Sequence, residues 1–451
     1  MFDGIKEFVK GVFRRMFPLK TINQVINDRV AMSEVMFKKI ELWGAMYQGL
    51  APWTTEYIKS MRLEQGICQE FANTCLLEMQ SEVTVEKLDK IYKKAIKNLN
   101  EELQSGLALG SFCVKPIGRD KVEYITADKF IPLSYDDTGR LIDVIFIQSK
   151  QINEEKTYYR FERHKLENEV LTISNRAFAS ETVGTIGVEV MLEEVPEWGT
   201  LPREVMYTGV KKPDFGYYRN PIKNNIDGSQ NGVSIFDSAI EQIKKADVQN
   251  ARLDWEFESA ERAVHVDQTA MLPTQNGKGK FKIPQLNKRL FKGINLMGGD
   301  GKSFYNEYSP ELREEHITNG LNTFLRQIEF NVSLAYGDIS DPKYIEKTAT
   351  EIKSGKYRKY NMVTAIQDNL KDCLEDLVYA LAFYNAMLNS GYEFECTFKD
   401  SVLTDEETER AQDRQDLANG VMSHLEYRMK WYGETEEQAR KNLPQLAGTI
   451  E

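Results

Sequence analysis

Three stretches of the sequence decide the fold: SIFDSAIEQIKKADVQNARLDWEFESAERAVHV (234–266), SPELREEHITNGLNTFLRQIEFNVSLA (309–335) and TATEIKSGKYRKYNMVTAIQDNLKDCLEDLVYALAFYNAML (348–388). Each repeats apolar residues at spacings of three and four, which predicts an amphipathic helix. A helix over 235–266 would be about 48 Å long at 1.5 Å per residue. That length exceeds what the core of a small domain needs. The order helix, insert, helix, short acidic loop and very long helix therefore organises the rest of the chain.

Helix-start signals support all three helices. Ser234 lies three residues before Asp237, and Ser309 is followed by Pro310 at a first-turn position. Residues 348–351 read Thr-Ala-Thr-Glu, the pattern of a reciprocal capping box. The apolar stripe of the third helix indicates packing in a core or an interhelical seam more than a cofactor site. This stripe comprises Val363, Ile366, Leu370, Cys373, Leu377, Leu381, Tyr384 and Leu388.

The insert between the first two helices reverses the charge of the chain. Residues 268–305 carry seven basic residues and one acid, Asp300, in a chain of net charge −11. Glycines and alternating apolar residues predict short strands or a β-ribbon at the far end of a helical hairpin. The excess of positive charge suggests a surface on which a partner docks. The alternative is a solvated surface ribbon that binds no partner. The basic residues are Lys278, Lys280, Lys282, Lys288, Arg289, Lys292 and Lys302.

Composition bounds the remaining possibilities. The 451 residues are 41% hydrophobic, enough for two or more globular domains. The chain has 58 Lys and Arg residues and 69 Asp and Glu residues, so it is acidic. A net negative charge argues against a protein that coats nucleic acid, but a channel wall that repels DNA can be acidic. The five cysteines form no Cys-x-x-Cys pair, so disulfides and zinc are unexpected and a reducing cytoplasm is the natural setting. No apolar run is long enough to span a bilayer.

The remaining segments predict a mixed α/β region around these helices. Helices are expected over 34–47, 67–79 and 84–105, and hairpin strands over 111–208. A turn-rich joint over 213–228 would separate this region from the first long helix. Residues 393–398 predict a strand, and short charged helices follow from 404 to 443. The first 29 residues form a basic amphipathic segment, which suits docking on protein better than on a membrane surface.

Motifs for catalysis, metals and nucleotides are missing from the sequence. Residues 298–303 end in Gly-Lys-Ser, but position 296 is Leu where a phosphate-binding loop needs glycine. The four histidines, His164, His265, His316 and His424, are scattered without metal-ligand or nucleophile spacing. We therefore expect no enzyme activity, no catalytic residue, no metal, no cofactor and no small-molecule substrate.

Five short motifs, taken in order, resemble the portal proteins of tailed bacteriophages, the head-tail connectors, in the branch common in phages of Gram-positive hosts. The resemblance runs from about residue 30 to 443, and its specificity lies in the ordered set. The motifs are Pro213–Tyr218, Asn224-Asn225-Ile226-Asp227, Gly232–Phe236, Ser309–Arg313 and Lys347–Glu351.

The resemblance implies an α+β portal fold. It has an α/β wing, a two-helix stem, a small β-containing clip, a long helix crossing the wing and a short α-helical crown. On this chain the parts would be an N-terminal segment (1–29), wing (30–234), stem helix (235–267), clip (268–308), stem helix (309–335), tunnel loop (336–347), long helix and return strand (348–400) and crown (401–451).

The same resemblance implies a homo-oligomeric ring of about twelve subunits at a capsid vertex of the virion, assembled in the host cytoplasm. Double-stranded DNA would pass through it during packaging and ejection. The terminase large subunit and a head-tail adaptor would dock on the clip, through the seven basic residues of the insert. The major capsid and scaffolding proteins would be further partners. The tunnel loop would line the DNA channel with Gly337, Asp338, Ser340, Asp341, Lys343, Glu346 and Lys347, its Asp338 and Asp341 repelling the polyanion.

Two other functions are weighed against this one. A membrane-associated coiled-coil scaffold protein would use the N-terminal segment and the stripe from Val363 to Leu388. A DNA-processing enzyme would need a metal or nucleotide dependence that no motif suggests.

Overall fold

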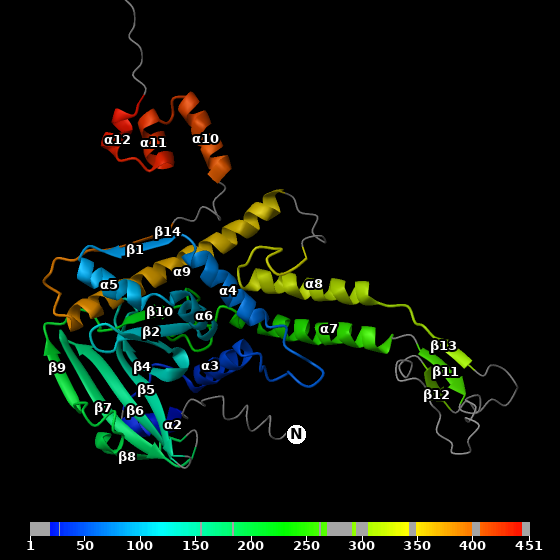
Figure 1. Cartoon of the computed structure of the whole chain (residues 1–451), viewed down its shortest axis with the longest axis horizontal. Coiled ribbons are helices and arrows are strands. Elements are labelled where there is room, and N and C mark those ends of the chain that lie inside the picture. The colour runs from blue at the N-terminus through cyan, green and yellow to red at the C-terminus, as the bar shows by residue number, and fades with distance from the viewer. Residues whose placement is uncertain are drawn as a thin grey trace, which may run out of the picture.

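The computed structural model describes residues 19–26, 28–153, 156–182, 185–260, 263–267, 291–294, 305–341, 349–398 and 406–443 (Figure 1). The structure combines helices with sheets whose described strands are antiparallel except for the pair β11 (Ala263–Asp267) and β12 (Phe291–Ile294), so the predicted α+β class is confirmed. A body of helices and sheets carries a long helical hairpin that ends in a small sheet at its free end.

The first part of the body is helical. Ser33 accepts a hydrogen bond from the Met36 amide, which fixes the start of α3 where the sequence predicts it. The single helix predicted over 84–105 is wrong, because the chain turns at 96–98. The turn lets Leu88 and Tyr92 on one side and Leu103 on the other all reach the core. The helices are α2 (Leu19–Ile26), α3 (Glu34–Tyr47), α4 (Leu63–Leu76), α5 (Glu86–Ala95) and α6 (Leu99–Leu109).

The largest sheet is antiparallel, with strand order β4-β5-β6-β7-β8, and the predicted hairpins form it. The short strands β8 and β9 both pair with β7, at its opposite ends. The 3-10 turns η1 (Ala127–Lys129) and η2 (Leu192–Glu194) flank the sheet. The strands are β4 (Phe130–Tyr135), β5 (Leu141–Asn153), β6 (Lys156–Glu167), β7 (Val170–Ser180), β8 (Val188–Val190) and β9 (Glu204–Thr208).

A second sheet has the order β10-β2-β3, from β2 (Ser111–Pro116), β3 (Val122–Thr126) and β10 (Gly216–Arg219). Strand β10 corrects the prediction of a purely irregular joint over 213–228. Its Tyr218 is fully buried and stacks on Phe112 with ring centroids 5.0 Å apart. Aromatic residues favour strands, and a paired neighbour outweighs the turn residues on either side.

A two-stranded sheet joins the two ends of the body. Strand β1 (Met79–Val83) pairs antiparallel with β14 (Phe394–Phe398), in a register that places Met79 opposite Phe398. The strand predicted after the long helix is confirmed, and it returns the chain to the N-terminal helices (Figure 1).

The hairpin consists of α7 (Ile240–Ser259), preceded by the 3-10 turn η3 (Asp237–Ala239), and α8 (Glu314–Asn331). The predictions of helix over 235–266 and 309–335 are therefore too long. Residues 263–267 form β11, because their alternating Val-His-Val pattern suits a strand paired on both sides. Strands β11 (Ala263–Asp267), β12 (Phe291–Ile294) and β13 (Tyr305–Tyr308) form the sheet at the free end of the hairpin (Figure 1).

The long helix α9 (Ala349–Tyr384) crosses the body, as predicted (Figure 1). Six of the eight predicted stripe residues are at most 1% exposed within the same chain, so this part of the stripe is core and not a free interhelical seam. They are Val363, Ile366, Leu370, Cys373, Leu377 and Leu381. Thr348 of the predicted capping box lies outside the described residues.

The predicted helices after 404 are confirmed as α10 (Glu406–Ala418), α11 (His424–Tyr432) and α12 (Glu436–Lys441). Capping boxes at Ser423 and Thr435 start the last two. The predicted N-terminal amphipathic segment falls mostly on residues 1–18, which lie outside the described residues.

Candidate functional site

The base of the hairpin is anchored to the body by two aspartates. Asp237 accepts hydrogen bonds from the Lys39 ammonium and the Trp43 indole, both at 2.8 Å. Ten residues further on, within α7, the buried Asp247 accepts bonds from the Trp53 indole and the Met61 amide, again at 2.8 Å. Charge-assisted bonds of this kind fix geometry as well as contribute energy. They hold the direction in which α7 leaves the body.

Side-chain bonds also join α7 to α8 along their length. At the base, the Ser238 hydroxyl donates to the Asn331 carbonyl at 3.0 Å. At the far end, the buried Glu256 carboxylate accepts from the Arg313 amide and guanidinium at 3.0 and 2.7 Å. Bonds at both ends keep the two helices in register, so the hairpin behaves as one rigid unit.

The loop after α8 is shaped by one buried carboxylate, that of Glu329. It accepts hydrogen bonds from the amides of Gly337, Ile339 and Ser340 at 2.8–3.0 Å and from the Ser340 hydroxyl at 2.8 Å. Glu329 is fully buried, and an internal carboxylate is tolerated where donors surround it. The turn also requires Gly337, whose φ is +96°.

A lysine of α9 fixes the same loop from the other side. The Lys359 ammonium lies 3.0 Å from the Asp338 carboxylate and 2.6 Å from that of Glu70 on α4. Burial alone would lower the pKa of Lys359, but the two carboxylates raise it overall. One cation therefore connects α4, α9 and the loop.

Arg358 completes this cluster. Its guanidinium lies over the rings of Phe330 and Tyr336, at 4.7 and 5.0 Å from their centroids. Phe330 belongs to α8 and Tyr336 to the loop, so Arg358 joins three elements at the point where the hairpin meets α9.

The structure describes only part of the predicted channel loop. Gly337, Asp338, Ser340 and Asp341 lie together, whereas Lys343, Glu346 and Lys347 lie outside the described residues. Ser340 is buried, and Asp338 is paired with Lys359 within the same chain. The role of these residues in lining a DNA channel stays a prediction. Asp341 is exposed, and its amide donates to Asn322 at 2.9 Å.

Of the seven basic residues predicted to dock a partner, only Lys292 belongs to a described element, the strand β12. Lys278, Lys280, Lys282, Lys288, Arg289 and Lys302 lie outside the described residues. The sheet itself supports the predicted β content of the insert, since β12 pairs parallel with β11 and β13 pairs antiparallel with it.

A buried polar network ties the large sheet to α9. The His164 ring lies 2.8 Å from the Asp214 carboxylate and 3.1 Å from that of Glu162, and the Tyr384 hydroxyl donates to Asp214 at 2.6 Å. Burial opposes a charged imidazole, yet the two carboxylates raise the pKa of His164 to about 9. Lys115 also bonds Glu162, at 2.6 Å. His164 and Asp214 are 3% and 1% exposed, so the geometry indicates structural bonding between the sheet and α9.

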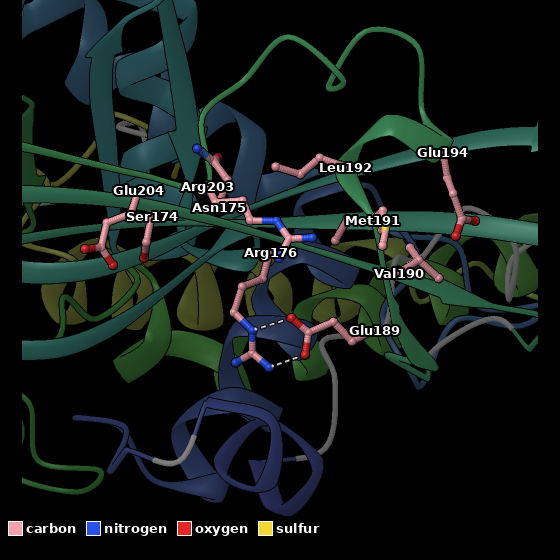
Figure 2. A pocket seen from close by; sticks show the side chains of 11 residues that line it. Ser174, Asn175, Arg176, Glu189, Val190, Met191, Leu192, Glu194, Arg203 and Glu204 are labelled. Atoms are coloured by element: carbon pink, nitrogen blue, oxygen red, sulfur yellow. Dashed lines mark hydrogen bonds and ion pairs between the residues drawn. The ribbon is translucent and has the colours of Figure 1, made fainter.

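Two surface hollows were considered as sites. The larger, of about 640 Å³, lies where β8 and β9 meet β7, and it is lined by Arg176, Glu189, Arg203 and Glu204 among others (Figure 2). Arg176 and Glu189 form a two-bond ion pair at 3.0 and 2.7 Å, which cancels the two charges. The other, of about 470 Å³, borders the loop 219–231. Neither brings together groups for a chemical step.

In the described ranges, no three His, Cys, Asp or Glu side chains are placed to hold a metal ion. All five cysteines are free and buried, and burial raises their pKa values where a shift is resolved. Of the helices that the structure describes, none is long and apolar enough to cross a membrane.

Sequence reasoning missed the residues that hold the loop: Glu329, Lys359, Arg358 and Glu70. One signal was available, because Glu329 falls on the apolar face of α8 beside Ile328 and Val332. A carboxylate on a buried face indicates an internal partner. The partners of Lys359 could not be read, since they depend on tertiary contacts.

Comparison with known proteins gives a weak similarity to solved structures. Neither a known protein family nor a curated protein matches the chain. Among solved structures, the chain is similar to one described as the neck of an empty GTA particle computed with C6 symmetry. The TM-score is 0.45 and the identity 11%, over 87% of this chain and 93% of that one. A similarity of this strength carries no argument about function.

Proposed function

We propose that the chain is a portal protein subunit that assembles into a ring-shaped channel for double-stranded DNA at a capsid vertex of a phage. One observation carries the proposal: the rigid α7–α8 hairpin leaves the body at one end, carries a small sheet at the other, and is followed by a docked loop and the body-crossing α9 (Figure 1). This spatial order is the one that the resemblance of the sequence to portal proteins implies.

The surface of the hairpin supports assembly with further copies. Trp255 and Phe257 of α7 are 66% and 51% exposed, and Phe330 of α8 is 56% exposed. Large aromatic side chains gain free energy when a partner covers them. Trp255 and Phe257 lie two positions apart and so project from different sides of α7. Two distinct contact surfaces per subunit are what a closed ring with head-to-tail interfaces requires.

The partners follow from the same proposal. DNA would pass through the ring, with the loop 336–347 next to it, during packaging and ejection. The terminase large subunit and a head-tail adaptor would dock at the sheet at the free end of the hairpin, and major capsid and scaffolding proteins would contact the body. We also propose that the chain acts without enzymatic activity of its own and resides in the virion after assembly in the host cytoplasm.

The alternative of a membrane-associated coiled-coil scaffold protein is weakened by the burial of α9. Most of the stripe that would form its intermolecular seam is enclosed in the core of the same chain. The N-terminal segment that it also requires lies outside the described residues. No contact that the structure describes favours this function.

Electron microscopy of the purified full-length chain in negative stain tests the proposal. We expect top views with a central hole. Native mass spectra should show one closed oligomer, and it should persist at moderate salt, because salt screens charged contacts but not apolar ones. A stable monomer or dimer at micromolar concentration would contradict the proposal.

A further inference from the structure

The three helices α10, α11 and α12 contain two arginines that meet at one uncharged group. Arg410 and Arg414 are one turn apart on α10, and the Nε–H of each donates to the Tyr427 hydroxyl of α11, at 3.4 and 3.2 Å. Tyr427 is 8% exposed and holds both side chains in place. A phenol oxygen carries no charge to offset two guanidinium cations, so the pair leaves a local excess of positive charge.

Nearby basic residues show the contrast. Arg428 pairs with Glu434, Lys430 with Asp413 and Arg440 with Glu436, each at 2.6–2.7 Å. Among residues 410–443, whose side chains the structure describes, no carboxylate lies at ion-pair distance from Arg410 or Arg414. The two guanidiniums also lower the pKa of the Tyr427 phenol through their hydrogen bonds, which agrees with a positive environment.

Aromatic rings complete the surface around this pair. The Arg410 guanidinium lies over Trp431 and Tyr432, at 5.7 and 5.9 Å from their ring centroids. The Trp431 indole is itself fixed by a 2.7 Å bond to Asp413. Tyr432 remains 56% exposed beside the arginines.

We propose that Arg410 and Arg414, held by Tyr427, form a binding site for the phosphodiester backbone of nucleic acid. Guanidinium groups match the paired oxygens of a phosphate, and one phosphate can accept from two of them. The exposed ring of Tyr432 offers a stacking or sugar contact next to the phosphate, which inorganic phosphate would not use. Because residues 406–443 carry nine acids and six bases, the segment has no general attraction for polyanions. The binding is local to this pair.

Each copy of the chain would make few phosphate contacts, so the affinity for DNA would depend on how many copies bind the same duplex. In a ring, the sites of neighbouring copies would act on one duplex and raise its apparent affinity. This step rests on the proposed function, whereas the site itself belongs to a single chain.

Binding of a short fluorescein-labelled DNA duplex to the full chain tests the site, measured by fluorescence anisotropy across a salt series. Arg410→Gln with Arg414→Gln should weaken DNA binding about tenfold or more. A plot of log affinity against log salt concentration should also become shallower, by about two for each binding site on the duplex. Arg440→Gln with Lys441→Gln is the matched control, because it removes the same charge from the same helical unit. The control should leave affinity and slope within about twofold.

Two further measurements keep the outcome interpretable. Arg410→Lys with Arg414→Lys keeps the charge but loses the planar guanidinium, and its affinity should fall between the wild type and the glutamine pair. Inorganic phosphate should compete with the duplex only weakly. Circular dichroism checks that each variant keeps its helices.

The inference is overturned if the glutamine pair binds DNA like the wild type, if the control pair loses as much affinity, or if inorganic phosphate binds where the duplex does not. Electron micrographs of the same samples separate this outcome from failure of the proposed function. If the glutamine pair forms rings and binds DNA as the wild type does, the binding site is refuted and the ring is not. If DNA binding depends on the two arginines but no rings form, the ring is refuted and the binding site is not.

Discussion

Lys359 of α9 lies 3.0 Å from Asp338, so the charge of this aspartate is balanced from within the chain. The ammonium is mostly enclosed, so removing Lys359 leaves Asp338 without this cation, and removing Asp338 leaves Lys359 with Glu70 alone. We expect Lys359→Met and Asp338→Asn each to destabilise the protein, with a coupling free energy of about 1–2 kcal/mol in a double-mutant cycle. Urea unfolding of the wild type, both single variants and the double variant measures it. If the effects of the two single substitutions on the free energy of unfolding simply add up in the double variant, the contact contributes no stability.

The Glu329 carboxylate satisfies four donors of the loop. We expect Glu329→Ala to lower the free energy of unfolding by about 2–4 kcal/mol, because buried N–H groups lose their acceptor. Hydrogen exchange should accelerate at the amides of Gly337, Ile339 and Ser340. The control Glu315→Ala, an exposed residue on the same helix, should change stability by less than about 0.5 kcal/mol. Unchanged exchange in the Glu329 variant would mean that the loop is held otherwise.

The network around His164 predicts a pH dependence of stability. The pKa of His164 is raised to about 9 in the folded chain, from an ordinary value of 6.5. The stabilisation is therefore fully present below pH 6.5 and is lost as pH rises through 9, at most of the order of 3 kcal/mol. Urea unfolding from pH 6 to 10 measures the decline. His164→Asn should lack this component, so parallel pH profiles for the two proteins would contradict the assignment.

Much of the helical architecture could be read from spacing and caps. The bounds of α3 agree with the sequence prediction because a serine cap and an apolar face coincide there. The sequence overestimates the length of α7 because Val264 continues the three-and-four spacing after Phe257 and Ala260. Val264 and Val266 also alternate as a strand does, and only the pairing with β12 and β13 decides between helix and strand.

The position of the loop could be predicted from the sequence, but its contacts could not, because these also depend on tertiary packing. Its position before α9 followed from Gly337 and the aspartates, which break a helix. The charge balance did not follow, since Lys359 and Glu70 are distant in sequence and meet Asp338 only after α4 and α9 pack. The strand β10 was missed likewise, because its partner β2 lies far upstream.

The basic insert remains a predicted docking surface. Reversing Lys278, Lys280 and Lys282 to Glu should leave ring assembly intact, because steering charges contribute to partner association more than to the fold. The change should weaken binding of a packaging motor or head-tail adaptor, most strongly at low salt. A pull-down across a salt series, with electron micrographs of the rings, measures both effects. Normal DNA packaging by the triple variant would show that this surface docks no partner.

Asp341 offers a test of the channel, because it is an exposed acid in the described part of the loop. If the loop lines the path of DNA, an acid there limits adhesion of the polyanion. Asp341→Lys should therefore keep rings intact but slow DNA translocation or ejection, more so at low salt, where screening is weaker. The control Asp254→Lys makes the same charge change at an exposed position on α7, away from the loop, and should leave the rate unchanged. Equal rates for Asp341→Lys and the wild type at both low and high salt would place this loop away from the channel wall.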